Sequence, residues 1–507
     1  MALINSVISW IMKKRMHQIG LFMKYPHEVQ SEWFKKLLNS AKNTEYGKKY
    51  GFQDIKSPET FKSRIPINDY QSLKPFIERN MKGEQQILWS SDIKWFAKSS
   101  GTTSDKSKFI PVSQESLEDC HFKGGKDMLS IYCSMFPDTV LFDGRGLAMG
   151  GSHRINEIRN EEFYIGDLSA IIIQNLPFWA EFIRVPKRKL ALLDEWESKI
   201  EQMAKATIHH NVTSISGVPS WTLLLLKRIL KITGKDDILE VWPNLEAFFH
   251  GGVNFTPYVE QFRKMTPSRD IRYLETYNAS EGFFGLQDTA SPDLLLMLDY
   301  GIYYEFLPVD KLGDPGGRTL SLDEVEKDTN YALIISTNAG LWRYLIGDTI
   351  KFTALNPYRI QITGRTKSFI NAFGEEVIIE NVDKALETAN KKCSSTVNEY
   401  TAGPVYFGDK EQGAHEWIIE FENPPENLQY FTETLDNALK SINSDYEAKR
   451  YRNLILKEPL IHTAPKGTFY EWMKRRGKLG GQNKVPRLSN DRKHLEEILT
   501  MIHNPPV

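Results

Sequence analysis

Apolar and polar positions in the first half of the chain alternate between helical and strand-like spacing. Trp33, Phe34, Leu37 and Leu38 recur at helical spacing, whereas Val212–Val218 is a short run with β-branched residues. The further predicted helices are Asp69–Asn80, Ser113–Tyr132, Leu190–Ile208, Trp221–Ile232 and Tyr258–Lys264. The predicted strands are Ile93–Ala97, part of Thr139–Gly151, Val212–Val218, Leu245–Phe249 and Asp270–Tyr277, and Ala170–Ile173 is a further β-branched run.

The pattern changes after Pro292. Short apolar segments separated by turn residues predict antiparallel strands over Leu294–Asp299, Ile302–Leu307, Tyr331–Ser336 and Thr349–Thr353. Strand–helix alternation followed by antiparallel strands predicts α/β layers with an appended β region.

The segment Tyr358–Arg365 closes this large body. The remaining part, about 140 residues with predicted helices and strands such as Trp417–Phe421, is long enough for a domain of its own. We therefore predict an α/β fold: a large, multi-sheet N-terminal domain of residues 1–363 and a smaller α+β domain of residues 364–507.

Composition limits the class of protein. Of the 507 residues 41% are hydrophobic, and 64 Lys and Arg nearly balance 65 Asp and Glu, which gives no argument for a nucleic-acid partner. Three widely spaced cysteines form no disulfide or zinc pattern and favour a reducing, cytoplasmic location. The apolar stretches of residues 1–24 are too short and too interrupted to span a bilayer, and an amphipathic helix is expected there.

The stretch Lys98–Lys108 is a candidate phosphate loop. Six consecutive small residues, Ser99–Ser104, offer backbone N–H groups that can form an anion nest, and lysines lie within or beside them. The stretch lacks the second glycine and the Gly-Lys-[Ser/Thr] ending of a Walker loop. Taken alone, the stretch favours a solvated Ser/Thr/Lys loop over a phosphate site.

Four later motifs, each weak alone, follow in a specific order. They are Gly251-Gly252 after a strand, Tyr277-Asn278-Ala279-Ser280-Glu281, Trp342-Arg343-Tyr344-Leu345-Ile346-Gly347-Asp348, and Gly364-Arg365 with Gly374-Glu375 beyond. Together with the phosphate loop they resemble the acyl-adenylating superfamily. Within it, these motifs and Gly481-Gln482-Asn483-Lys484-Val485-Pro486-Arg487 are similar to the acyl acid–amido synthetase family, the auxin-responsive family of plants and its bacterial branch.

The resemblance implies an ATP-dependent ligase with a mobile C-terminal lid. Such an enzyme adenylates a carboxylic acid, uses Mg²⁺, and transfers the acyl group to the amine of an amino acid, releasing AMP and pyrophosphate. Two alternatives stay open from the sequence: an acyl-CoA ligase that shares the first step, and a non-catalytic nucleotide-binding protein. Small-molecule acids and amino acids are the expected partners, without nucleic acid or a membrane span.

The resemblance also implies roles for individual residues. For the phosphates they are Ser99, Ser100, Gly101, Thr102, Thr103 and Lys108, and for adenine and ribose Gly251, Gly252, Tyr277, Asp348 and Arg365. Glu281 is the expected magnesium ligand. Lys484 is the expected catalytic lysine of adenylation, with Lys466 and Lys478 as competitors. Residues that flank the nucleotide motifs are candidates for the acid pocket: Val218, Pro219, Phe283, Phe284 and Tyr303.

Overall fold

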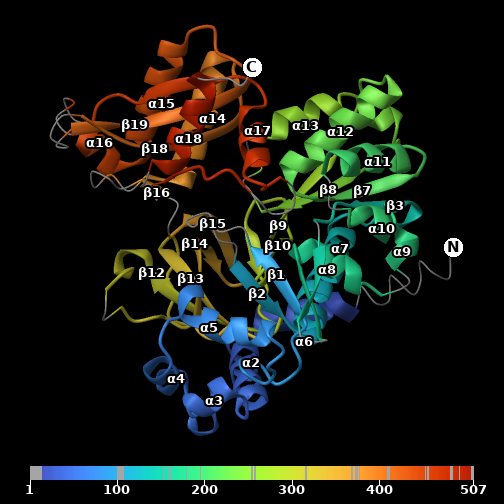
Figure 1. The fold of residues 1–507 in the computed structure, drawn as a ribbon, viewed down its shortest axis with the longest axis vertical. Coiled ribbons are helices and arrows are strands. Elements are labelled where there is room, and N and C mark those ends of the chain that lie inside the picture. Colours follow the sequence, from blue (N-terminus) through green and yellow to red (C-terminus); the bar gives the residue numbers. More distant parts are fainter. Residues whose placement is uncertain are drawn as a thin grey trace.

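The computed structural model describes residues 14–99, 108–151, 153–158, 161–177, 180–193, 196–252, 255, 258–314, 317–366, 369–370, 375, 377–407, 412–450, 453, 456–479, 484–489 and 492–503. Residues 14–24 are helical. The helices of the N-terminal part are α2(Pro26–Ala41), α3(Glu45–Lys49), α4(Pro58–Arg64), α5(Tyr70–Met81), α6(Gln114–Ser116), η2(Leu117–Phe122), α7(Lys123–Met135), α8(Leu168–Asn175), α9(Ala180–Ile183), α10(Arg188–Ala191), α11(Trp196–Thr207), α12(Pro219–Thr233) and α13(Val259–Met265), with short 3₁₀ turns between them. Helices α2–α5 lie at the opposite end of the molecule from the C-terminal elements (Figure 1).

One long sheet organises the large body. Within the described residues it has eleven strands, in the order β12(Ile302–Pro308), β13(Asn330–Thr337), β14(Tyr344–Leu355), β15(Tyr358–Arg365), β11(Leu294–Leu296), β10(Gly282–Gln287), β9(Arg272–Ala279), β8(Ala247–Gly251), β7(Val212–Gly217), β3(Arg145–Ala148) and β6(Arg184–Val185). Strands β9, β8, β7, β3 and β6 are parallel, and the strands from β9 to β12 are antiparallel.

The antiparallel strands continue this sheet, so the expectation of an appended β region is wrong in that respect. Strand β9 pairs parallel with β8 on one side and antiparallel with β10 on the other. Strand β11 then joins β10 to β15, which follows it by more than sixty residues in sequence. The change of pattern at Pro292 therefore marks a change of strand direction within a single sheet.

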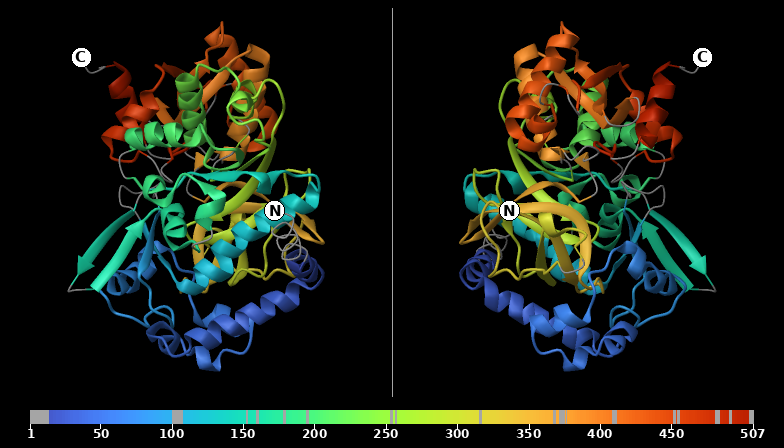
Figure 2. Two further views of the ribbon diagram at one scale, coloured as in Figure 1. Left: turned by 90° about the vertical axis from the view of Figure 1, so that its right-hand side faces the viewer. Right: turned by 90° about the vertical axis from the view of Figure 1, so that its left-hand side faces the viewer.

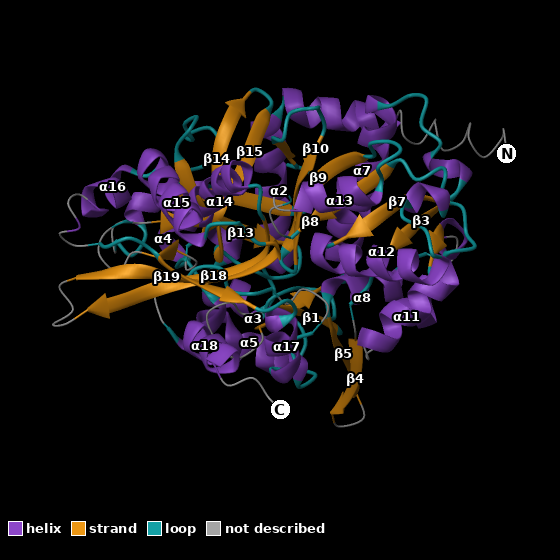
Figure 3. Ribbon diagram, turned by 90° about the horizontal axis from the view of Figure 1, so that it is seen from above, coloured by secondary structure: helices purple, strands orange, loops and turns teal. Residues whose placement is uncertain are grey.

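A second sheet holds the candidate phosphate loop. Its order is β2(Lys108–Val112), β1(Trp95–Ser99), β5(Glu161–Gly166), β4(His153–Ile158). Strands β1 and β2 are antiparallel, with Ser99 opposite Lys108, so residues 100–107 connect two paired strands. Those connecting residues lie outside the described part of the chain. Strands β4 and β5 project from the body (Figures 2 and 3).

The C-terminal elements have their own sheet and core. Strands β18(Thr396–Phe407), β19(Gln412–Asn423) and β20(Leu460–Ala464) form the sheet, beside a short β16(Phe369–Ile370)–β17(Val377–Ile378) pair. The helices are α14(Ile379–Cys393), α15(Leu428–Ile442), α16(Ser444–Arg450), α17(Thr468–Arg475) and α18(Lys493–His503). Trp417, Phe431 and Leu435 are fully buried in a hydrophobic cluster between this sheet and α14 and α15, separate from the cluster of the large body.

Most of the predicted elements are confirmed, one predicted helix is corrected, and one run without an assigned element is a helix. The β-branched run Ala170–Ile173 lies in helix α8, whose Ile171 and Ile173 are buried. The helix predicted over Leu190–Ile208 is instead two helices, α10 and α11. Within the described residues no helix is long and apolar enough to cross a membrane.

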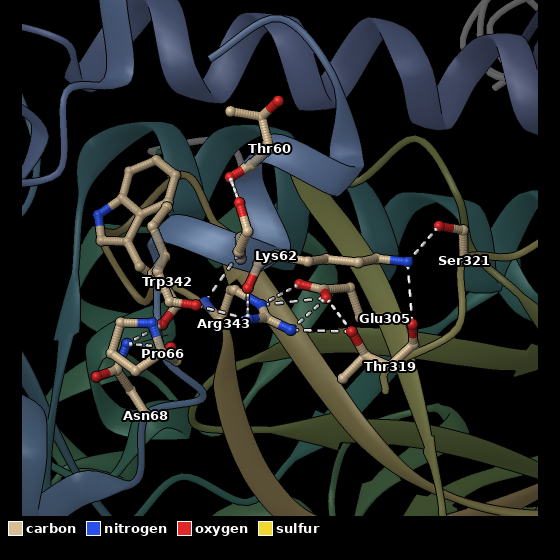
Figure 4. A network of polar contacts seen from close by, with 12 residues as sticks. Thr60, Lys62, Pro66, Asn68, Glu305, Thr319, Ser321, Trp342 and Arg343 are labelled. Atoms are coloured by element: carbon tan, nitrogen blue, oxygen red, sulfur yellow. Dashed lines mark hydrogen bonds and ion pairs between the residues drawn. The ribbon is translucent and has the colours of Figure 1, made fainter. Parts of the chain in front are cut away.

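Arg343, from the third nucleotide motif, anchors the start of β14 (Figure 4). Its guanidinium donates hydrogen bonds to the Glu305 carboxylate at 2.9 to 3.1 Å, to Thr319 Oγ1, and to the backbone carbonyls of Lys62 and Ile65. The backbone of Arg343 has a positive φ of 43°. The buried ion pair between Arg343 and Glu305 fixes the start of β14, the strand that carries Asp348. Arg343 therefore has a structural role.

Candidate nucleotide and acid site

The candidate site lies at the carboxyl edge of the parallel strands. Strands β7, β8 and β9 run in register, with Gly217 beside His250 and Gly251 beside Thr276. Val218, Gly252 and Glu281 follow the ends of these three strands. In α/β sheets this edge is where ligands bind.

Tyr277, Asp348 and Arg365 form a connected cluster from three strands. The Tyr277 hydroxyl donates a hydrogen bond to Asp348 Oδ2 at 2.8 Å, and Arg365 Nε lies 3.0 Å from Asp348 Oδ1. Asp348 and Arg365 are also opposite each other in the β14–β15 register. The carboxylate of Asp348 raises the pKa of Arg365, while burial, together with Asp348, raises the pKa of Tyr277 well above its ordinary value. The Asp348 carboxylate is thus held in one orientation by a hydroxyl on one oxygen and a guanidinium on the other.

Glu281 adds a second carboxylate to the same cavity. Burial raises the pKa of Glu281, the positive charges of Lys108 and Arg365 oppose the shift, and Asp348 adds to it. Lys108 comes from β2, the strand that follows the candidate phosphate loop. Positively and negatively charged side chains therefore line the same cavity.

Lys484 reaches the site from the C-terminal part. A Cβ placed on Gly252, whose φ is +79°, would lie 3.6 Å from Lys484 Nζ and 3.8 Å from Val218 Cγ2. Burial lowers the pKa of Lys484 to about 7, and the neighbouring charges of Arg365 and Arg487 lower it further, against the opposing effect of Asp348. Its competitors Lys466 and Lys478 do not line this cavity.

All of these groups line one cavity of about 1290 Å³. Of the predicted site residues within the described chain, those that line it are Lys108, Val218, Gly251, Gly252, Tyr277, Glu281, Phe283, Asp348, Arg365 and Lys484. Ser99 ends β1 and its side chain is not described, whereas Ser100, Gly101, Thr102 and Thr103 lie outside the described residues, as do Gly374 and residues 481–483. The cluster predicted from separate motifs therefore comes together within the described part of the chain, which does not include residues 100–107.

Three candidates for the acid pocket are not on the cavity. Pro219, Phe284 and Tyr303 are absent from its lining. Phe284 is fully buried in the core, and the Tyr303 ring packs 5.0 Å from that of Phe34. Phe284 and Tyr303 flank the motifs in sequence, but they belong to the hydrophobic core of the large body, and Pro219 is the first residue of α12.

Comparison with known proteins identifies the family. The model of the GH3 family N-terminal domain matches residues 15–271, that of the central domain residues 295–365, and that of the C-terminal domain residues 380–493. The chain belongs to the GH3 family. This assignment confirms the resemblance to the acyl acid–amido synthetases.

Relatives and solved structures agree with the assignment. The GH3 chain is 23% identical to the indole-3-acetic acid-amido synthetase GH3.3 of Arabidopsis thaliana, over 90% of this chain and 89% of the relative. Its fold is similar to that of the GH3.15 acyl acid amido synthetase, with a TM-score of 0.77 at 16% identity and coverage of 94% and 93%. A 2-hydroxyisobutyryl-CoA ligase in complex with an acyl-AMP also has a similar fold, with a TM-score of 0.59 at 12% identity and coverage of 94% and 91%. The similarity to both confirms the predicted α/β fold.

The structure adds cavity residues of this GH3 chain that sequence reasoning missed. His121, Glu275 and Asn278 line the cavity, and none was assigned a role. Glu275 and Asn278 lie on β9, close to Tyr277, so their position along the strand was a usable signal. No signal in the sequence indicated His121, because a lone histidine in a helical pattern is more often an ordinary core residue.

Glu275 makes stability depend on pH. Burial raises the pKa of Glu275 from 4.5 to about 7. Between these values the folded protein holds a proton that the unfolded chain has released, so this carboxyl's contribution to stability falls as pH rises from 4.5 to 7. We expect Glu275→Gln to raise the free energy of unfolding by about 1–3 kcal/mol at pH 8 and by less than about 0.5 kcal/mol at pH 5.

Urea titrations at the two pH values measure this difference. Glu260→Gln is the matched control, because the Glu260 side chain is 67% exposed, and we expect no such pH-dependent gain from it. An equal gain from Glu275→Gln at both pH values would contradict the buried-carboxyl explanation.

Proposed function

We propose that this GH3 protein is an ATP-dependent ligase that joins a carboxylic acid to the amine of an amino acid. The observation that carries the proposal is the convergence of Asp348, Glu281 and Lys484 on one cavity at the carboxyl edge of the sheet. The relative from Arabidopsis thaliana is named an indole-3-acetic acid-amido synthetase, which supports an amine as the acyl acceptor.

The first half-reaction activates the acid. An oxygen of the substrate carboxylate attacks the α-phosphorus of ATP, the bond to the β-phosphate breaks, and pyrophosphate leaves with the electron pair. Asp348 holds the ribose, while Lys108 and the Ser99–Thr103 loop hold the phosphates. Lys484 donates hydrogen bonds to the α-phosphate and carboxylate oxygens as negative charge accumulates there.

Magnesium fits this site as a partner of the nucleotide. Within the described part of the chain no group of three or more His, Cys, Asp or Glu side chains could hold a metal on its own. Glu281 would supply one ligand, and phosphate oxygens would supply others, as is usual for Mg²⁺. Bound there, the ion neutralises charge on the phosphates.

The second half-reaction transfers the acyl group. The amine nitrogen attacks the carbonyl carbon of the acyl adenylate, AMP leaves with the electron pair of the C–O bond, and the amine loses a proton as the amide forms. Lys484 lies beside Gly252 and Val218, and we propose that the amine approaches through the same space. We therefore propose that the C-terminal part acts as a lid that moves between the two steps. It would pivot beyond β15, because Gly364 and Arg365 are paired with β14 in the large sheet.

Acid-dependent exchange of labelled pyrophosphate into ATP tests the activation step. The purified protein is assayed with aryl, indolyl and fatty acids, and active acids are then offered amino acids or CoA. We expect an amide product without a requirement for CoA. A thioester product would instead support a CoA ligase, a class that shares this fold. Nucleotide binding without exchange for any acid would support a non-catalytic nucleotide-binding protein.

A cytoplasmic location is part of the proposal. None of Cys120, Cys133 and Cys393 is in a disulfide, as expected in a reducing compartment. Free amino acids and ATP are available there as substrates.

A further inference from the structure

Two polar side chains line the cavity where helix η2 meets the sheet. His121 lies on η2, a π-helical segment, and Asn278 lies on β9 opposite Phe283 of β10. His121 is 5% exposed, and its side chain lies next to that of Asn278. π-Helical segments are frequent at functional sites.

The position of η2 is fixed by close contacts with β10. The backbone N–H of Phe283 donates a hydrogen bond to Cys120 Sγ at 3.1 Å. A Cβ added to Gly124 would lie 2.5 Å from the Phe283 ring, so the helix approaches the strand as closely as glycine allows. His121 is therefore held rigidly against the strand pair that carries Asn278.

Both side chains present a buried polar atom without a partner. Within the described part of the chain, His121 Nδ1 makes no hydrogen bond of normal geometry, and Asn278 Oδ1 accepts none. Burial lowers the pKa of His121 to about 4, so its ring is neutral at neutral pH. Buried polar atoms in native proteins are nearly always hydrogen-bonded, which indicates that a ligand completes this pair.

The surrounding wall is mainly apolar. The cavity-lining side chains from α7, α8 and neighbouring strands include Met128, Met149, Ile172, Ile173, Phe249 and Phe283. An apolar pocket with a few placed polar groups is typical of a small-molecule site, in which the polar groups decide specificity.

We propose that His121 and Asn278 recognise a hydroxyl group on the body of the carboxylic acid substrate, an inference that rests on the proposed function. A hydroxyl can accept a hydrogen bond from His121 Nδ1–H and donate one to Asn278 Oδ1. A carboxylate brings only acceptor oxygens and would face another acceptor at Asn278. The substrate class is therefore an otherwise apolar acid that carries one uncharged hydroxyl.

Pairs of acids that differ by one hydroxyl test this proposal. Phenyl, indolyl and straight-chain acids, each with and without a hydroxyl at successive positions, are compared by kcat/KM for pyrophosphate exchange. For the best hydroxy acid we expect the wild-type protein to prefer it over its unsubstituted partner by about 10- to 1000-fold. Asn278→Leu should bring this ratio of kcat/KM values to about one or below, mainly by lowering kcat/KM for the hydroxy acid.

Met128→Leu is the matched control, because it alters an apolar part of the same wall. It should change kcat/KM for both members of a pair together and leave their ratio unchanged. Exchange with unsubstituted acids but no hydroxyl preference in the wild type overturns this inference alone, as does a preference that survives in folded Asn278→Leu. Absence of exchange with every acid overturns the proposed function, and this inference with it.

Discussion

Replacing Glu281 with glutamine is expected to lower acid-dependent pyrophosphate exchange by about 10²–10³-fold while the protein stays folded. The change keeps the shape of the side chain and removes the negative charge that would hold Mg²⁺ beside the phosphates. Because burial already raises the pKa of Glu281, the neutral amide relieves a desolvation cost, so stability should not fall.

Glu275→Gln is the matched control for this experiment. Both side chains are partly buried, both line the cavity, and both have pKa values raised by the loss of solvent around the carboxyl group. Exchange at saturating Mg²⁺ should stay within about threefold of wild type for Glu275→Gln, and the Mg²⁺ concentration for half-maximal rate should rise only for Glu281→Gln. Near-normal exchange by folded Glu281→Gln would remove the proposed metal role.

The elements around the site were predictable because their sequence signals are local. Apolar runs that end at glycine or proline predicted β7, α12 and β8 correctly, and α12 ends at Gly234 with a φ of +66° as its pattern indicated. The run Ala170–Ile173 forms a helix because its isoleucines are buried on several sides, and tertiary packing outweighs the preference of β-branched residues for strands.

Strand order was not predictable in the same way. The pairing of β11 with β15 joins segments that no local pattern relates. That pairing makes one sheet of what the sequence presents as two regions. The backbone N–H and C=O groups at the edge of a strand need a neighbouring strand as hydrogen-bond partner. Which strand supplies it depends on the fold of the whole chain and not on local sequence.

The site was predictable where its residues stand in ordered motifs, and not elsewhere. Asp348 and Arg365 were identified by resemblance, and they form an ion pair. Arg343, in the same motif as Asp348, anchors the strand through Glu305 and takes no place in the cavity lining. His121 reaches the cavity through a π-helical turn, which shifts the side-chain register and which the helical spacing of the sequence does not reveal.

Replacing Lys484 with methionine is expected to separate the two half-reactions. Methionine keeps much of the aliphatic stem and removes the ammonium that would stabilise charge on the α-phosphate. We expect adenylation to slow by about 10²–10³-fold. Amide formation from a supplied acyl adenylate should stay within about threefold of wild type, because the proposed lid movement takes Lys484 away before the amine attacks. Single-turnover assays of each step measure the split.

The pKa of Lys484 gives this variant a second signature. Its value of about 7 in the free protein leaves the amine mostly neutral at pH 8, and the phosphates of ATP should return it to the charged form. ATP binding at pH 8 should therefore take up about one proton, whereas at pH 6 it should take up almost none at this group. Calorimetry in buffers of different ionisation enthalpy measures the uptake, which Lys484→Met should abolish.

Lys466→Met serves as the control for both readouts. Its side chain is 63% exposed and lies 3.7 Å from Glu422, outside the cavity. We expect adenylation, amide formation and proton uptake to match wild type in this variant. If Lys484→Met slows both half-reactions equally, Lys484 takes part in both of them. A lid movement that takes Lys484 away between the two steps would then be contradicted.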